Sequence, residues 1–183
     1  KEGPAEDQDN GERIAGLLRF VTTKSEGDTQ SVGLDQYCER MPEAQEKIYY
    51  ITADSLTAAR YSPHLEIFRK NDIEVLLLTD HVDEWLVSHL HEYKGKKLQS
   101  VAKGEIDDAL IKEEQQEEKE EKAEEQKAFL ERVQSSLGER SKEVRVSKRL
   151  TESPACLVVE DYDMSQNLAR VLKQMGQDAP MPT

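Results

Sequence analysis

A run of charged residues divides this chain into two unlike blocks. Residues 105–131 hold twelve acidic and four basic side chains and few apolar ones. A segment of this composition cannot build a hydrophobic core of its own, so we expect a spacer or a solvated helix. Residues 47–103 before it alternate between predicted strands and helices, and residues 144–175 after it hold two short predicted strands and a helix. This layout favours a protein of several parts over a compact enzyme with one cleft.

Charge and hydropathy argue against nucleic acid and membrane as partners. The 183 residues carry a formal net charge of −13 without a basic stripe, which is a poor match to the phosphate backbone of a nucleic acid. No apolar run approaches the roughly 18 residues of a membrane helix, and no signal peptide precedes the first block. We therefore expect a cytoplasmic protein with no nucleic-acid or membrane partner and with Cys38 and Cys156 as reduced thiols. Because the chain opens at Lys1 without a methionine, we also expect it to be cut from a longer protein.

The pattern before the charge run predicts an α/β fold. Apolar residues at helical spacing predict two short helices near residues 14–21 and 34–41. A parallel βαβ sheet is then expected, with its elements in the order strand 48–51, helix 55–60, helix 63–70, strand 74–78, helix from Asp80 or Asp83 to Tyr93, and strand 98–101. The expected organisation is a helical leading segment (1–46), a small α/β subdomain with a parallel sheet (47–104), a long charged connecting helix (105–138) and a small α+β piece (139–183).

The last block contains a predicted helix with an apolar stripe, which is either buried or exposed. Two strands are predicted at residues 144–147 and 156–160, followed by a helix that Asp163 begins. Such a stripe usually packs into a core, yet two short strands offer little sheet to cover, so an exposed groove or flap is also open. The stripe consists of Met164, Leu168, Val171, Leu172 and Met175.

Candidate chemistry is sparse. No closely spaced glycines follow the strands at Ile51 or Leu78, so a phosphate-binding loop is not expected. His89 and His91 are two residues apart and would face different sides of one helix, and the acids near Asp80 suit a helix start better than a metal. Trp85, the single tryptophan, is either a half-buried core residue at the edge of a helix stripe or an exposed anchor for a polypeptide.

Several motifs together resemble one family. Residues 14–20 (IAGLLRF), 45–52 (QEKIYYIT), 62–66 (SPHLE), 74–80 (EVLLLTD), 83–85 (DEW) and 95–101 (GKKLQSV) look like the middle domain of the ninety-kilodalton heat-shock chaperones. Residues 149–155 (RLTESPA) resemble the opening of the C-terminal domain of the same family, and the bacterial form is the most similar. The resemblance covers nearly the whole chain, with the motifs in order.

The resemblance implies an ATP-driven, homodimeric chaperone of three domains. This chain would hold the end of the middle domain and the start of the C-terminal domain. It would have no catalytic residue, cofactor or metal of its own, because ATP and magnesium bind elsewhere in the full-length family. Dimerisation would likewise need the full-length protein. The chain is therefore not expected to be an enzyme.

The resemblance also implies where clients bind. Partly folded polypeptides contact two surfaces in the family, which match Glu84, Trp85 and Ser88 here, and Met164, Leu168, Val171 and Leu172. Trp85 and Met164 are thus predicted client contacts rather than core residues. Gly33 and Ser88 depart from the family pattern, and residues 111–126 are unusually rich in charge. The alternative is a small α/β enzyme or ligand-binding domain with a charged tail, whose substrate would lie near residues 52–55 and 79–83; a coiled-coil spacer is excluded because apolar heptads are not sustained.

Overall fold

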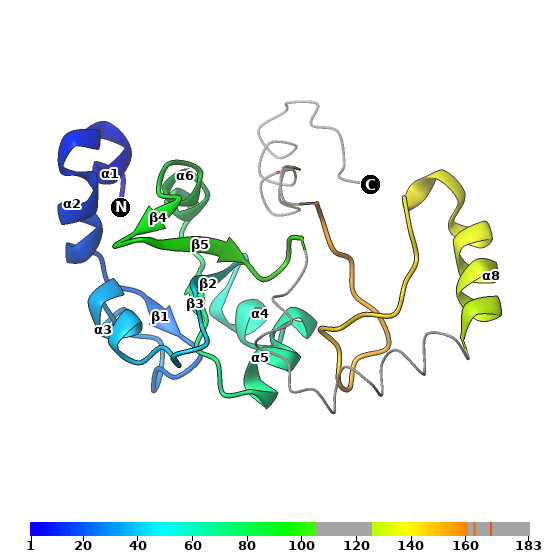
Figure 1. Cartoon of the computed structure of the whole chain (residues 1–183). Helices are drawn as coiled ribbons and strands as arrows, with labels where there is room; N and C mark the ends of the chain where they lie inside the picture. The colour runs from blue at the N-terminus through cyan, green and yellow to red at the C-terminus, as the bar shows by residue number, and fades with distance from the viewer. Residues whose placement is uncertain (105–125, 161–162, 164–168, 170–183) are drawn as a thin grey trace.

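The chain forms an α/β unit, a separate helix and a segment that returns from that helix to the unit (Figure 1). The computed structural model describes residues 1–104, 126–160, 163 and 169. The separate helix, α8 (Lys127–Leu137), carries no buried residue. It ends where Gly138 adopts a positive φ of 56°, a conformation that glycine adopts without steric cost. A helix that stops at Gly138, as the sequence predicts, is therefore present over residues 127–137. Residues 105–125 lie outside the described part, so the connecting helix as a whole stays a prediction.

A five-stranded sheet in the order β1-β3-β2-β5-β4 organises the α/β unit. In its centre, β2 (Lys47–Thr52) lies parallel to both β3 (Leu76–Leu78) and β5 (Lys96–Ser100). At its edges, β1 (Val21–Thr22) pairs antiparallel with β3, and β4 (Glu92–Tyr93) pairs antiparallel with β5. The predicted parallel sheet is confirmed, and the antiparallel edge strands extend it on both sides.

Helices cover both faces of the sheet (Figure 1). One face carries α4 (Leu56–Arg60), the 3-10 helix η2 (Pro63–Leu65) and α5 (Glu66–Lys70). The other face carries α2 (Gly11–Leu17), α3 (Leu34–Glu39) and α6 (His81–His89). The other short helices that the structure describes are α1 (Gly3–Glu6), η1 (Gln8–Asn10) and η4 (Gly138–Arg140).

Covering on both faces explains the unbroken apolar run in β3. Leu77 packs on the face of Phe68, whereas Leu76 and Leu78 pack on the opposite face with Leu86. A strand buried on one face alternates apolar and polar residues, but a strand covered on both faces is apolar throughout. Residues 1–46 supply β1, α2 and α3 to the same sheet and core as residues 47–104.

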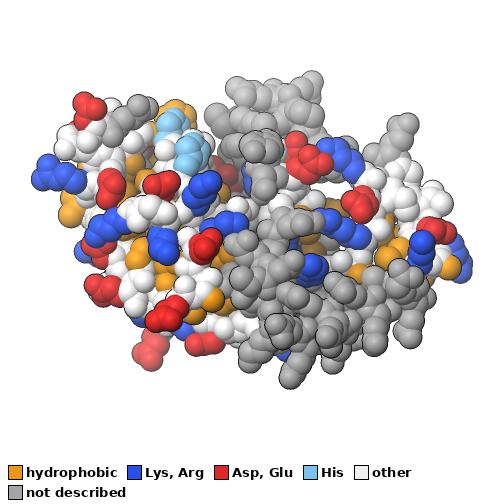
Figure 2. Space-filling view, in the orientation of Figure 1, with side chains coloured by type: hydrophobic (Ala, Val, Ile, Leu, Met, Phe, Trp, Pro, Cys, Tyr) orange, Lys and Arg blue, Asp and Glu red, His pale blue; other side chains and the backbone are white. Residues whose placement is uncertain are grey.

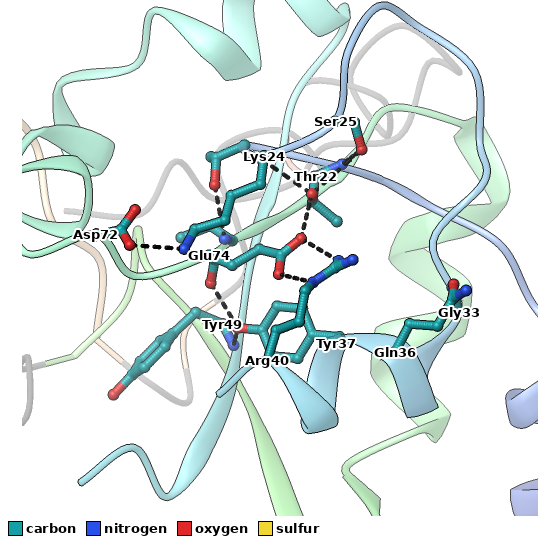
Figure 3. Close-up of polar contacts among 12 residues, drawn as sticks. Thr22, Lys24, Ser25, Gly33, Gln36, Tyr37, Arg40, Tyr49, Asp72 and Glu74 are labelled. Atoms are coloured by element: carbon teal, nitrogen blue, oxygen red, sulfur yellow. Dashed lines mark hydrogen bonds and ion pairs between the residues drawn. The ribbon is translucent and has the colours of Figure 1, made fainter. Parts of the chain in front are cut away.

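A buried polar network joins α3 to the central strands (Figure 3). The hydroxyl of Tyr37 donates to the backbone oxygen of Glu74 at 2.6 Å and accepts from the backbone N–H of Tyr49 at 3.0 Å. The Glu74 carboxylate in turn accepts two hydrogen bonds from Arg40 and one from Thr22. Burial raises the pKa of Tyr37 far above its usual value. The network therefore fixes α3 against β2 and β3 through groups that satisfy one another.

Serine side chains cap the helix starts on the first face. Ser55 Oγ accepts from the backbone N–H of Ala58 at 3.1 Å at the start of α4. Ser62 Oγ accepts from the backbone N–H of His64 at 3.3 Å, and Pro63 occupies the first position of η2. These caps satisfy backbone N–H groups that would otherwise lack a partner at the start of each helix.

Four sequence-based assignments are wrong in detail. Val21 lies in β1, because the helix before it ends at Leu17. Tyr93 lies in β4, because Lys94 and Gly95 both adopt positive φ and turn the chain into an antiparallel hairpin. The strands predicted at 144–147 and 156–160 do not form; in that described stretch the backbone makes an isolated parallel bridge between Val159 and Lys103.

Candidate functional site

Paired carboxylates hold the start of α6, the helix with the first predicted client residues. Asp83 Oδ2 accepts from the backbone N–H of Asp80 at 2.9 Å, and Lys1 Nζ lies 2.7 Å from a carboxylate oxygen of each of the two aspartates. Asp83 is almost fully buried, and burial raises its pKa although Lys1 opposes the shift. Hydrogen bonds from Lys1 and Gln30 lower the pKa of Asp80. The interpretation of these acids as helix-capping residues is confirmed.

Trp85 lies on the outer surface of α6. Its side chain is 52% exposed, whereas the next residue, Leu86, is 2% exposed and belongs to the core. The indole packs on the ring of His89, with ring centroids 4.2 Å apart. Ser88 Oγ donates to the backbone oxygen of Trp85 at 2.8 Å. The tryptophan is therefore held from one side by its own helix and presents much of its remaining surface to solvent.

The structure brings only part of the predicted client site together. Glu84, Trp85 and Ser88 share α6, where Glu84 is half-buried and Ser88 exposed. The second predicted group of Met164, Leu168, Val171 and Leu172 lies outside the described residues. Figure 2 shows histidine side chains next to hydrophobic ones at the upper part of the α/β unit, with acidic and basic side chains interspersed below them.

A second cluster of polar contacts lies where the returning segment meets the α/β unit. The carboxylate of Glu66, the first residue of α5, accepts from the backbone N–H groups of Thr151, Glu152 and Ser153 over 2.6–3.2 Å. The hydroxyl of Ser153 also donates to this carboxylate. We call this arrangement the Glu66 clasp. It joins two sequence motifs whose pairing the sequence did not predict.

Other hydrogen bonds join the same two parts on both sides of the clasp. We call the whole contact between the α/β unit and residues 149–159 the seam. Arg149 is 4% exposed and donates through its guanidinium to the backbone oxygens of Lys103 and Gly104. Its own backbone oxygen accepts from the N–H of Ile67 at 3.1 Å. Further along, the N–H of Gly104 donates to the backbone oxygen of Val159 at 2.9 Å. The segment is thus bound at the start of α5 and beyond the end of β5.

A cavity of about 130 Å³ lies beneath this seam, at the ends of β2 and β5. Its lining offers His64 and Lys103 as titratable groups, together with hydroxyls of Thr52, Ser62 and Ser100. Lys103 Nζ donates to the backbone oxygen of Asp163. Burial, aided by the nearby Arg149, lowers the pKa of His64 to about 4, so this imidazole is neutral at pH 7. The described lining does not assemble a nucleophile with a base and an orienting acid.

Neither a cluster of metal ligands nor a membrane-spanning helix occurs in the part of the chain that the structure describes. Residues 1–104 and 126–160 contain no group of three or more histidine, cysteine, aspartate or glutamate side chains placed to hold a metal ion. None of the helices described in these ranges is long and apolar enough to span a bilayer.

The fold defines the class of protein. The chain is similar to the solved middle domain of a Plasmodium falciparum putative heat shock protein, with a TM-score of 0.52 and 38% sequence identity over 56% of this chain and 42% of that one. The middle domain of a heat-shock protein is therefore the class of fold to which this α/β unit belongs. Residues 1–182 match the family model described as Hsp90 protein, and the chain belongs to the Hsp90 family.

Bacterial chaperones share most of the sequence. The chain is 60% identical over 178 residues to the chaperone protein HtpG of Nitrosospira multiformis and 56% identical over 181 residues to that of Nitrosococcus oceani. These alignments cover 97% and 98% of this chain. The chain spans about 28% of the length of either relative. The family resemblance predicted from the motifs is confirmed.

Proposed function

We propose that this chain binds partly folded polypeptide clients through the surface of α6 formed by Glu84, Trp85 and Ser88. The observation that carries the proposal is the 52% exposure of Trp85 beside a fully buried Leu86. An aromatic side chain supplies a large contact area at a low cost in conformational entropy, and clients that are not fully folded expose the apolar groups it would meet. Met164, Leu168, Val171 and Leu172 form the second side of the proposed site, on the strength of the family resemblance.

A second function is favoured by the seam between the α/β unit and residues 149–159. Backbone and side-chain contacts at Glu66, Ile67 and Gly104 all hold the returning segment. We propose that these contacts couple the middle domain to the start of the C-terminal domain. A change at one domain would then reach the other through a fixed attachment rather than a loose linker.

Membership of the family supports a proposal for the whole protein of which this chain is a part. We propose that the whole protein is an ATP-driven homodimer in the cytoplasm, and that ATP and magnesium bind in parts other than this chain. We propose further that this chain is not itself an enzyme and that self-association needs the rest of the protein.

Substitution of Trp85 by arginine tests the client site. We expect the variant to bind a fluorescently labelled, partly folded client about tenfold more weakly, because an interface anchor is lost. Thermal unfolding should change little, because the side chain is not part of the core. Tyr61→Arg is the matched control: Tyr61 is an aromatic residue that is 80% exposed, and its substitution should leave client affinity unchanged.

Two results would contradict the client site. A large loss of stability in Trp85→Arg would make Trp85 a core residue. Unchanged affinity with intact stability would place the client surface elsewhere. Met164→Asp, measured in the same assay, tests the second side separately, because a charge there opposes an apolar contact.

A further inference from the structure

The Glu66 clasp encloses a charge, whereas the rest of the seam consists of neutral acceptors. The bonds from Ile67 to Arg149 and from Gly104 to Val159 join backbone groups, and the Arg149 guanidinium donates to backbone oxygens. Hydrogen bonds in which one partner is ionised are about twice as strong as neutral ones. The Arg149 guanidinium is ionised as well, but the Glu66 carboxylate is the charged group of the seam on which three successive backbone N–H groups converge.

The geometry of the clasp suits an anion. The backbone N–H groups of Thr151, Glu152 and Ser153 follow one another in the chain and converge on one carboxylate. Successive N–H groups that converge in this way form an anion-binding concavity. Burial raises the pKa of Glu66, but the bonds from Glu152, Ser153 and Thr151 outweigh it and lower the pKa to about 2. The carboxylate is therefore ionised at neutral pH.

Glu66 is also firmly attached to the core of the α/β unit. The two residues that follow it in α5, Ile67 and Phe68, are 2% and 1% exposed, and Phe68 packs on Tyr49 of β2 with ring centroids 4.9 Å apart. A segment bound to Glu66 is consequently attached, through α5, to the centre of the sheet. The path of that segment is therefore fixed relative to the α/β unit.

We infer, on the basis of the coupling proposed above, that Glu66 is the positioning residue that holds the returning segment on the α/β unit. Its carboxylate binds a concavity made by residues 151–153 and so sets the path of the chain through to the bridge at Val159. The bridge beyond the end of β5 then depends on the clasp, although the clasp and the bridge share no residue.

Glu66→Gln is the substitution that tests this role. The amide keeps the size of the side chain, but it removes the charge and turns an NH₂ donor toward backbone donors. Glu66→Asp keeps the charge and shortens the side chain by one methylene. Glu152→Gln is the matched control, because it makes the same chemical change in an exposed residue whose backbone N–H, rather than its carboxylate, belongs to the clasp.

Amide hydrogen exchange, followed residue by residue by NMR at neutral pH, provides the readout. In Glu66→Gln we expect exchange at Thr151, Glu152 and Ser153 to rise by about tenfold or more, and exchange at Gly104 and Val159 to rise with it. Amides of β2 and β3 should keep their wild-type rates, which separates positioning from a general loss of stability. Glu66→Asp should show a smaller rise, and Glu152→Gln none.

Three outcomes overturn the inference. Unchanged exchange at residues 151–153 means that the clasp does not hold them. Faster exchange at the clasp alone, with Gly104 and Val159 unaffected, means that the contact is local and positions nothing. An equal rise throughout the sheet means that Glu66 contributes only to global stability. None of these outcomes depends on client binding, so the client site is tested by its own experiment. If the inference fails, the proposed coupling rests on Arg149 and the bridge at Val159.

Discussion

The hydroxyl of Tyr37 is a buried side-chain group that bonds to the backbone of two other segments. Tyr37 OH lies in the core, donates to the backbone oxygen of Glu74 and accepts from Tyr49 N–H and Gln45 Nε2. The N–H of Tyr49 belongs to a central strand and is buried, so it has no access to water as a substitute partner. Individual atoms of this kind decide how α3 sits on the sheet.

Tyr37→Phe should therefore destabilise the fold by roughly 1–3 kcal/mol, because the buried donors of Tyr49 and Gln45 lose their acceptor. Tyr61→Phe removes the same hydroxyl from a residue that is 80% exposed, and it should change stability by less than about 0.5 kcal/mol. Urea unfolding of both variants measures the difference. Equal effects would mean that the Tyr37 hydroxyl contributes nothing beyond its ring.

At the scale of elements, local patterns predicted the centre of the fold and missed its edges. Apolar and β-branched runs at 48–51 and 74–78 are sufficient to identify parallel strands that are covered on both faces. The two-residue strands β1 and β4 carry no such pattern; they form because longer neighbours offer them hydrogen bonds. Resemblance to the family predicted Trp85 as a client contact, and this stays a prediction. No pattern predicted the pairing of Glu66 with residues 151–153, since contacts across 85 or more positions leave no periodic signal.

The seam between α5 and the returning segment should weaken in acid in two steps. His64 has a pKa lowered from its usual 6.5 to about 4, so the folded state loses stability as pH falls from 6.5 to 4. Glu66 has a pKa lowered from 4.5 to about 2, so its contribution is complete above pH 4.5 and disappears toward pH 2. Unfolding measured against pH should show the first loss missing in His64→Gln and the second missing in Glu66→Gln. Parallel curves for wild type and both variants would refute this assignment.

At the scale of the whole molecule, the described parts form an α/β unit, an exposed helix and an attached segment rather than a body with one cleft. The cavity under the seam is small and the Trp85 surface is open, which suits contact with large partners better than enclosure of a small substrate. The helix α8 stands apart from the sheet (Figure 1), and most of the charge run lies outside the described residues.

Purified chain should not hydrolyse ATP. The ends of β2 and β3 are followed by Ala53 and Thr79 rather than by the glycines of a phosphate-binding loop. Phosphate release with magnesium and ATP should equal that of buffer. A saturable turnover that a point substitution in this chain abolishes would show that a nucleotide site lies within it.

The shortness of β1 and β4 has a consequence for a protein whose proposed partners are partly folded chains. A long, open sheet edge would invite such a chain to add itself as another strand, and growth of that kind leads to aggregation. Here both edges are two residues long, and a bridge between Phe20 and Val32 continues the sheet's border only briefly. The backbone therefore gives a visiting polypeptide little to pair with. If the proposed client site is correct, contact falls to side chains such as Trp85, and a client can dissociate from them without breaking a series of backbone hydrogen bonds.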